Sequence, residues 1–138
     1  MGQRIVTAAV SASLVAALCS GCFVQDEKVA QKTARITIDN DTRTSHAVSC
    51  SQVDWMLTAN ITAAPANVRV LLKLDPQKPT VESVNFDNFA GFSGVADTDD
   101  SKIHFANDTY TITGTAQGSQ LNDPRVSVTR PFKIEVGC

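Results

Sequence analysis

The sequence predicts an all-β fold, an antiparallel β-sandwich or open barrel of short strands that forms a single domain. From position 34 onward, apolar and polar residues alternate with a period of two in most segments. Strands that bury one face and expose the other produce this pattern. Turn signals such as Asn40-Asp41 and Asn107-Asp108 separate the segments. Strands of a buried parallel sheet would instead read as continuous apolar runs, so we expect antiparallel strands.

The first expected strands follow from the side chains that share a face. In 35–39, two isoleucines alternate with polar residues. In 55–61, Trp55, Leu57 and Ile61 fall on one face together with an alanine. Both segments are therefore expected to bury one face against the rest of the domain.

The later strands are expected to pack in the same way. Alternation predicts strands at 68–74, 81–86, 103–105 and 110–113. The last strand, 132–136, has the clearest pattern, because its aromatic and aliphatic residues occupy every second position. Lys133 and Glu135 lie between them and are expected on the solvated face.

The first 21 residues have the three-part layout of a secretory signal peptide. Arg4 precedes an almost uncharged stretch over 5–18, and small residues then lead to Cys22. Bacterial lipoprotein signals end in this way, so we expect cleavage before Cys22 and acylation of its thiol. Cys19 stands where such signals usually carry leucine, which bears on the efficiency of cleavage. The alternatives are a transmembrane helix, which needs about 17–25 apolar residues, and an ordinary secreted protein with a free Cys22.

Cleavage would leave one domain on a tether. The expected organisation is a signal peptide over 1–21, an acylated cysteine and flexible tether over 22–33, and a β-rich domain over 34–138. The tether is polar, carries charges of both signs and shows no strand alternation. A flexible segment of this length spans roughly 17–20 Å. The domain is long enough to bury a core of its own.

The charge balance excludes some classes of partner. The chain has 12 basic and 14 acidic residues among its 138. This weakly acidic balance leaves no electrostatic footprint for nucleic acid and no polybasic patch for a membrane surface. Membrane attachment is therefore expected to come from acyl chains on Cys22, since two or more chains anchor a protein stably. We expect the protein to be a monomer.

The four cysteines have separate expected fates. Cys19 leaves with the signal peptide and Cys22 is acylated, so Cys50 and Cys138 remain as a candidate disulfide in an oxidising compartment. In the chain-entropy model, a link of this length constrains the unfolded chain by about 4–5 kcal/mol. The alternative is that Cys50 and Cys138 are two unpaired, buried thiols.

Candidate chemical sites are weak. The acidic run 97–100 lacks the glycine at the sixth position and the glutamate at the twelfth that a calcium loop requires. His46 and His104 have no nearby cluster of cysteine or glutamate, so they make a poor zinc site. The run 91–94 is not a nucleophile elbow, because its second glycine comes one residue too early. The run is expected to lie in a loop, in which Phe89 and Phe92 would form either an exposed patch or a cap on the core. We expect no enzymatic activity, no metal and no cofactor.

Two segments carry a family resemblance. They are Asp108-Thr-Tyr-Thr-Ile-Thr-Gly-Thr-Ala-Gln-Gly118 and the terminal Phe132-Lys-Ile-Glu-Val-Gly-Cys138. The stretches 38–39, 81–84 and 122–124 and the pair of cysteines also fit. Over 34–138 the chain resembles the mycobacterial nineteen-kilodalton lipoprotein antigen family, the LpqH-like lipoproteins.

The resemblance implies a surface-exposed, acylated antigen. Its acyl cysteine, Cys22 here, would be the group that the host's Toll-like receptor for lipoproteins recognises. It also implies a structural bridge between Cys50 and Cys138. The family's best-known member has a threonine- and alanine-rich, O-glycosylated tether, whereas 23–33 contains only one threonine.

Two hypotheses for the function follow. The first is an exported, lipid-anchored antigen that faces outward from the cell envelope and is recognised by host innate immunity through its acylated Cys22. The alternative is a carrier or binding module of the envelope that holds a lipid or small apolar ligand between its sheets. A roomy apolar cavity would favour the carrier, and Trp55, Leu57 and Ile61 would then be the first lining residues to examine.

Overall fold

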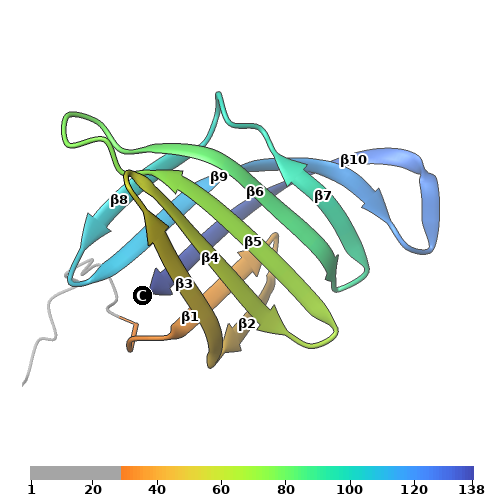
Figure 1. Cartoon of the computed structure of the whole chain (residues 1–138). Coiled ribbons are helices and arrows are strands. Elements are labelled where there is room, and N and C mark those ends of the chain that lie inside the picture. The colour runs from red at the N-terminus through yellow and green to blue at the C-terminus, as the bar shows by residue number, and fades with distance from the viewer. Residues whose placement is uncertain (1–28) are drawn as a thin grey trace, which may run out of the picture.

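The computed structural model describes residues 29–138, which form ten strands joined by short turns (Figure 1). All neighbouring strands run antiparallel. The strands are β1 (Thr33–Ile38), β2 (Asp41–Ser45), β3 (Ala47–Val53), β4 (Met56–Ala63), β5 (Ala66–Lys73), β6 (Thr80–Phe89), β7 (Phe92–Ala96), β8 (Lys102–Ala106), β9 (Thr109–Gln120) and β10 (Asp123–Gly137). The predicted all-β, single-domain fold is confirmed.

One sheet curls until it nearly closes into a barrel. Its strand order is β2-β1-β10-β9-β7-β6-β5-β4-β3, and β8 pairs with β9 beside this path. The two ends of the sheet are β2 and β3, which only His46 separates along the chain. These ends also meet in space, because β2 contacts β4 and β1 contacts β3. The two halves of the sheet therefore face each other and enclose a common core (Figure 1).

The core consists of apolar side chains that the register brings into rows. Ile36 of β1 lies opposite Ile134 of β10, which in turn lies opposite Ile112 of β9, and all three are fully buried. The ring of Phe86 lies 6.3 Å from that of Phe92 and 5.2 Å from that of Phe132, measured between centroids. Burying a side chain of this size contributes about 1.5–3 kcal/mol, so each member of these rows stabilises the fold.

Two glycines allow β7 and β9 to approach closely. Gly94 of β7 lies opposite Gly118 of β9. A Cβ atom on Gly118 would collide with the carbonyl oxygen of Ser93, and one on Gly94 would collide with that of Gln117. Glycine at both positions therefore lets β7 and β9 pair in this register.

Three strands are absent from the sequence prediction. In β2, only Ser45 is buried, so its exposed polar residues give no alternating signal. Most of β3 is exposed as well. The segment 91–94, expected as a loop, is the β6–β7 turn and the start of β7, and Phe89 and Phe92 on either side of the turn are fully buried. These two phenylalanines belong to the core and do not form an exposed patch.

Trp55 differs from its predicted place. The indole was expected inside with Leu57 and Ile61, but 54% of the residue is exposed. Asp54 takes a positive φ of 52° and, with Trp55, makes the tight turn between β3 and β4. Strand β4 therefore begins at Met56, one residue later than the alternating pattern in the sequence, which starts at Trp55. Trp55 is left at the tip of the hairpin.

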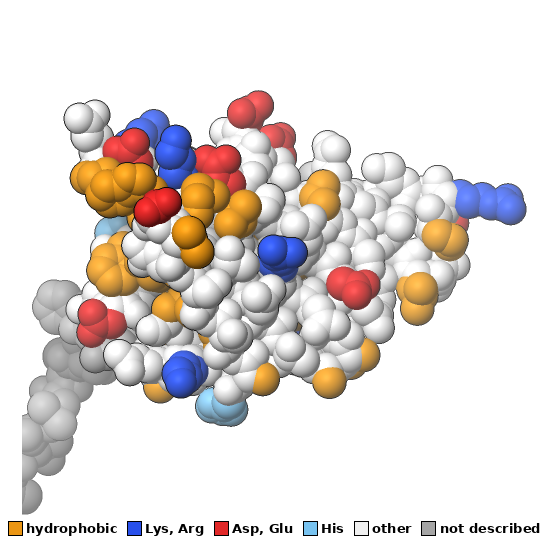
Figure 2. All heavy atoms as spheres, in the orientation of Figure 1, with side chains coloured by type: hydrophobic (Ala, Val, Ile, Leu, Met, Phe, Trp, Pro, Cys, Tyr) orange, Lys and Arg blue, Asp and Glu red, His pale blue; other side chains and the backbone are white. Residues whose placement is uncertain are grey.

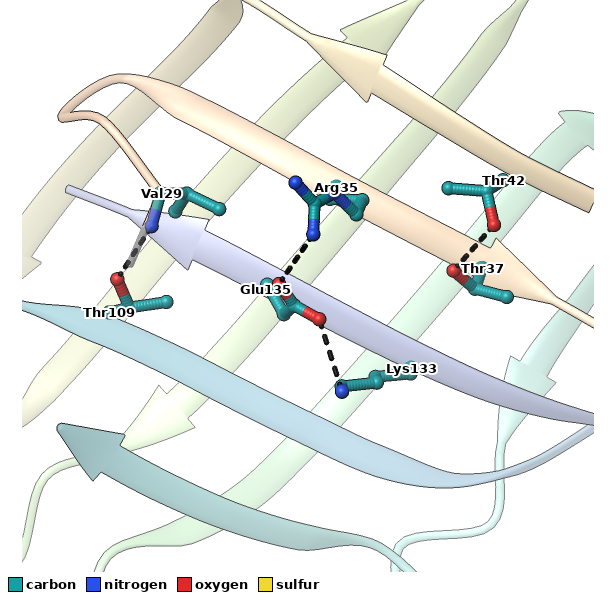
Figure 3. Close-up of polar contacts among 7 residues, drawn as sticks. All are labelled: Val29, Arg35, Thr37, Thr42, Thr109, Lys133 and Glu135. Atoms are coloured by element: carbon teal, nitrogen blue, oxygen red, sulfur yellow. Dashed lines mark hydrogen bonds and ion pairs between the residues drawn. The ribbon is translucent and has the colours of Figure 1, made fainter. Parts of the chain in front are cut away.

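Glu135 points outward as predicted, yet its side chain is only 8% exposed. Arg35 on β1 covers it with Nη1 3.5 Å from Oε2, and Lys133 on its own strand places Nζ 3.2 Å from Oε1 (Figure 3). Charged partners on the outer face can therefore bury a carboxylate without turning it into the core.

Candidate functional site

Cys22, the expected acylation site, lies outside the described residues, so the site is built from the place where the described chain begins. Val29 is buried, and its N–H donates to Thr109 Oγ1 at 3.2 Å (Figure 3). The Thr109 hydroxyl donates in turn to the carbonyl of Asn107 at 3.2 Å. Asn107 and Asp108 both have positive φ, as a two-residue type I′ hairpin requires. The described chain therefore begins against the β8–β9 turn.

The residues just after Val29 are also held against the barrel. The N–H of Lys32 donates to the carbonyl of Gly137 at 2.7 Å, and that of Thr33 donates to the carbonyl of Ala30 at 3.1 Å. Thr33 already belongs to β1. Within the expected tether, 22–33, the described residues 29–33 thus pack on the domain.

The same end of the barrel carries the disulfide. Cys50 on β3 and Cys138, the last residue, are joined with their Cα atoms 5.7 Å apart. The predicted pairing is present, and the alternative of two free thiols is wrong. The bridge ties the end of β10 to β3 across the opening of the curled sheet. It therefore holds together two strands that share no ladder of hydrogen bonds.

A shallow hollow of about 250 Å³ opens beside the disulfide. Phe105 of β8 pairs with Tyr110 of β9, and the centroids of their rings lie 4.5 Å apart. Burial raises the pKa of the Tyr110 phenol above its ordinary value, because the charged phenolate is poorly solvated there. The hollow is lined by Gln31, Gln52, Leu57, Phe105, Asp108, Tyr110 and Cys138.

Large apolar side chains are exposed around this hollow. Val53 is 71% exposed, Trp55 54% and Phe105 53%. Val53 and Trp55 belong to the β3–β4 turn region, whose neighbours Gln52 and Leu57 line the hollow with Phe105. Figure 2 shows hydrophobic side chains gathered at this end of the molecule, over the β3–β4 turn and β8. We call Val53, Trp55 and Phe105 the apolar end.

The interior does not favour the carrier hypothesis. The inward side chains fill the space between the two halves of the sheet, and the largest of them are fully buried. Leu57 and Ile61 belong to this packed core, whereas Trp55 lies outside it. A ligand of lipid size would have to displace core side chains, because protein interiors are close-packed.

The remaining candidates do not assemble into a chemical site. Asp97 Oδ1 accepts the N–H of Asp99, and Asp100 Oδ2 accepts the hydroxyl of Thr115, so these carboxylates brace the β7–β8 loop. His46 Nδ1 lies 3.4 Å from Thr33 Oγ1, while His104 lies on β8. Within residues 29–138, no three His, Cys, Asp or Glu side chains gather as a metal site would need. No helix long and apolar enough to span a membrane occurs in that range.

Comparison with known proteins identifies the class. The model of the family described as Mycobacterium 19 kDa lipoprotein antigen matches residues 27–138. The chain is 31% identical over 141 residues to the protein named probable lipoprotein LppE of Mycobacterium tuberculosis, with both chains covered in full. It is 31% identical over 110 residues to lipoprotein LpqH of Mycobacterium avium, covering 75% of this chain and 67% of that one.

The curled, disulfide-closed sheet is therefore the domain of a lipoprotein. The chain belongs to the mycobacterial 19 kDa lipoprotein antigen family. Membership of this family associates the protein with a membrane of the cell envelope. The names of both relatives describe lipoproteins, and neither names an enzymatic activity.

Proposed function

We propose that the protein is an envelope antigen that faces outward and is anchored by acyl chains on Cys22. The observation that carries the proposal is the agreement between the family and the lipoprotein signal, which ends at Cys22. The alignment with LppE runs the full length of both chains and so includes residues 1–22. The domain would be non-catalytic and would present its surface to the outside.

The geometry of the domain supports this proposal. The described chain begins at one end of the barrel, at Val29 beside the β8–β9 turn. The β9–β10 hairpin extends past the barrel at the other end (Figure 1). Such a domain can be held by its N-terminus while its far end stays accessible to antibodies or receptors.

Anchoring is tested by changing Cys22 to Ala and separating cells into envelope and soluble fractions. The variant is expected in the soluble or precursor pool, because it has no thiol to acylate. Intact-mass analysis of the natural protein should find a mass above that of the unmodified chain 22–138. Peptide mapping should place the increase on the peptide that begins at Cys22. A processed variant that still needs detergent for extraction would contradict the proposal.

Host recognition would depend mainly on the lipid. Each buried CH₂ of an acyl chain contributes about 0.8 kcal/mol, so a lipid-free domain would lose most of its receptor affinity. The test compares the acylated protein with the Cys22→Ala protein in a cell reporter for the Toll-like receptor of lipoproteins. Equal potency of the two would refute recognition through the lipid and favour a site on the protein surface.

A further inference from the structure

The apolar end lies where the anchored chain must approach the membrane. Val29 is hydrogen-bonded to Thr109, at the turn of the β8–β9 hairpin, whose strands carry Phe105 and Tyr110. Six residues, 23–28, lie between Val29 and the acylated Cys22. Even fully extended, they span at most about 25 Å. With Cys22 acylated, the end of the barrel that carries Phe105 would be held within about 25 Å of the bilayer surface.

We propose that the apolar end (Val53, Trp55 and Phe105) rests in the interface of the bilayer that holds Cys22, so that the domain stands end-on. The proposal rests on the anchoring of Cys22 and adds the orientation of the domain. Tryptophan and other aromatic side chains favour the membrane interface, where an apolar ring and a polar environment coexist. Trp55 at the tip of the β3–β4 hairpin and Phe105 on β8 offer two such rings at one end.

The charges beside the apolar end favour a neutral interface. Asp54 precedes Trp55, and Asp108 lies in the turn after β8. Lys73 pairs with the first residue of β4, and Lys102 begins β8. Because both signs are present, no strong attraction to anionic lipids is expected, and the contact should depend little on salt.

A second copy of the chain is a less suitable partner for the apolar end than the bilayer interface. Three half-exposed side chains offer an apolar area on the order of 300 Å². A stable dimer needs roughly 800 Å² from each partner. A tethered surface needs far less, because the tether raises the effective concentration of the two surfaces to about the millimolar range.

The orientation also places the other end of the molecule. β10 has 15 residues, so it extends at most about 50 Å from Gly137 toward the β9–β10 turn. Leu121 in that turn is 77% exposed. In the end-on orientation this hairpin points away from the bilayer.

Trp55 is the only tryptophan in the chain, so its fluorescence reports on this end alone. The mature chain, residues 22–138 with the Cys50–Cys138 disulfide intact, has one free thiol at Cys22. That thiol is coupled to a maleimide lipid in phosphatidylcholine vesicles. The coupling replaces natural acylation, so the test does not depend on processing in cells.

The coupled protein is expected to show a blue-shifted Trp55 emission, quenching by brominated lipid, and about twofold protection from acrylamide, as for an indole at a bilayer interface. Phe105→Ser and Val53→Ser should each weaken the quenching by brominated lipid. The matched control Leu121→Ser alters an equally exposed apolar residue at the far end and should leave it unchanged. Two variants on different hairpins guard against one that fails to fold.

Two results would overturn the orientation. In one, Trp55 of the coupled protein remains as accessible to acrylamide as in the uncoupled protein. In the other, Trp55 becomes protected without lipid as the protein concentration rises, which would assign the apolar end to a second copy. A failure of Cys22 acylation in cells would appear separately, in the fractionation of the Cys22→Ala protein.

Discussion

The N–H of Val29 donates to the Thr109 hydroxyl at 3.2 Å, across 80 positions of the sequence. This hydrogen bond joins the start of the described chain to the turn between β8 and β9. Because the bond is buried, the segment that leads to Cys22 begins at one defined place on the barrel. The direction in which an anchored domain stands depends on this contact.

Replacing Thr109 with Val should loosen the attachment of Val29. The valine keeps the shape of the side chain but removes the acceptor, so the buried N–H loses its partner at a cost of about 1–3 kcal/mol. Hydrogen exchange measured by NMR should become faster at the Val29 amide. The control is Thr37→Val, whose hydroxyl bonds Thr42 on the exposed face and should not affect Val29. Unchanged exchange at Val29 in the Thr109 variant would contradict this assignment.

Removing the disulfide should destabilise the domain strongly. The double change Cys50→Ala and Cys138→Ala is expected to lower the free energy of unfolding by about 2–5 kcal/mol, because the bridge closes a link of 88 residues. Urea unfolding measures the loss. The change Cys22→Ala in the same mature chain serves as a control and should leave the midpoint unchanged. Equal stability with and without reductant in the parent protein would argue against a structural role for the bridge.

Gly118→Ala should strain the contact between β7 and β9. The new methyl group would meet the carbonyl oxygen of Ser93, which belongs to a paired strand and cannot rotate away. Overpacking of this kind costs about 1–3 kcal/mol, measurable as a lower melting temperature. Gly114→Ala is a useful comparison, because the nearest atom to its methyl group is the Ser101 hydroxyl, 2.9 Å away. This contact and the one with Ser101 Cα at 3.1 Å are longer than the clash at Gly118, so a larger loss for Gly114 than for Gly118 would contradict the explanation.

Ionisation of Tyr110 should destabilise the fold at high pH. Burial raises the pKa of this phenol in the folded state above 10.0, so the folded protein holds the proton more tightly than the unfolded chain does. The resulting stability is fully present below the unfolded pKa and is lost as the pH rises through the folded pKa. Tyr110 is the only tyrosine, so tyrosinate absorbance follows its titration directly.

The control for this titration is Tyr110→Phe, which removes the ionising group and keeps the ring beside Phe105. Its free energy of unfolding should depend less on pH in the alkaline range than that of the parent. A Tyr110 that titrates in the folded protein at or below 10.0 would show that its burial has no such effect.

The sequence predicts the strands with strict alternation well and the exposed edge strands poorly. Val68, Val70 and Leu72 alternate with polar or less buried residues, and all three lie in the core of β5. In β2, the strand forms because β1 offers a partner, as in the pairing of Thr37 with Thr42. Its own residues bury almost nothing, so no pattern of hydrophobicity could reveal it.

The candidate site was predictable only in part. The four cysteines could be sorted by their order along the chain, and the pair that remained is the disulfide of the structure. The apolar end was not predictable. Trp55 was expected inside, because the alternation that begins at Leu57 extends back to it without interruption. Only the positive φ of Asp54 turns the chain before Trp55 and leaves the indole at the surface.

The sequence by itself predicted the fold class and the pairing of Cys50 with Cys138, which the structure confirms, because periodicity and cysteine count are local or additive properties. It also predicted a lipoprotein signal, which lies outside the described residues and stays a prediction. The tertiary structure alone decided which strands close the barrel and that Val29 is held at the same end of the barrel as Phe105. It also decided that Trp55 shares that end of the barrel. These relations join residues far apart in the chain, and they arise from the register of paired strands and the twist of the sheet, which no single segment specifies.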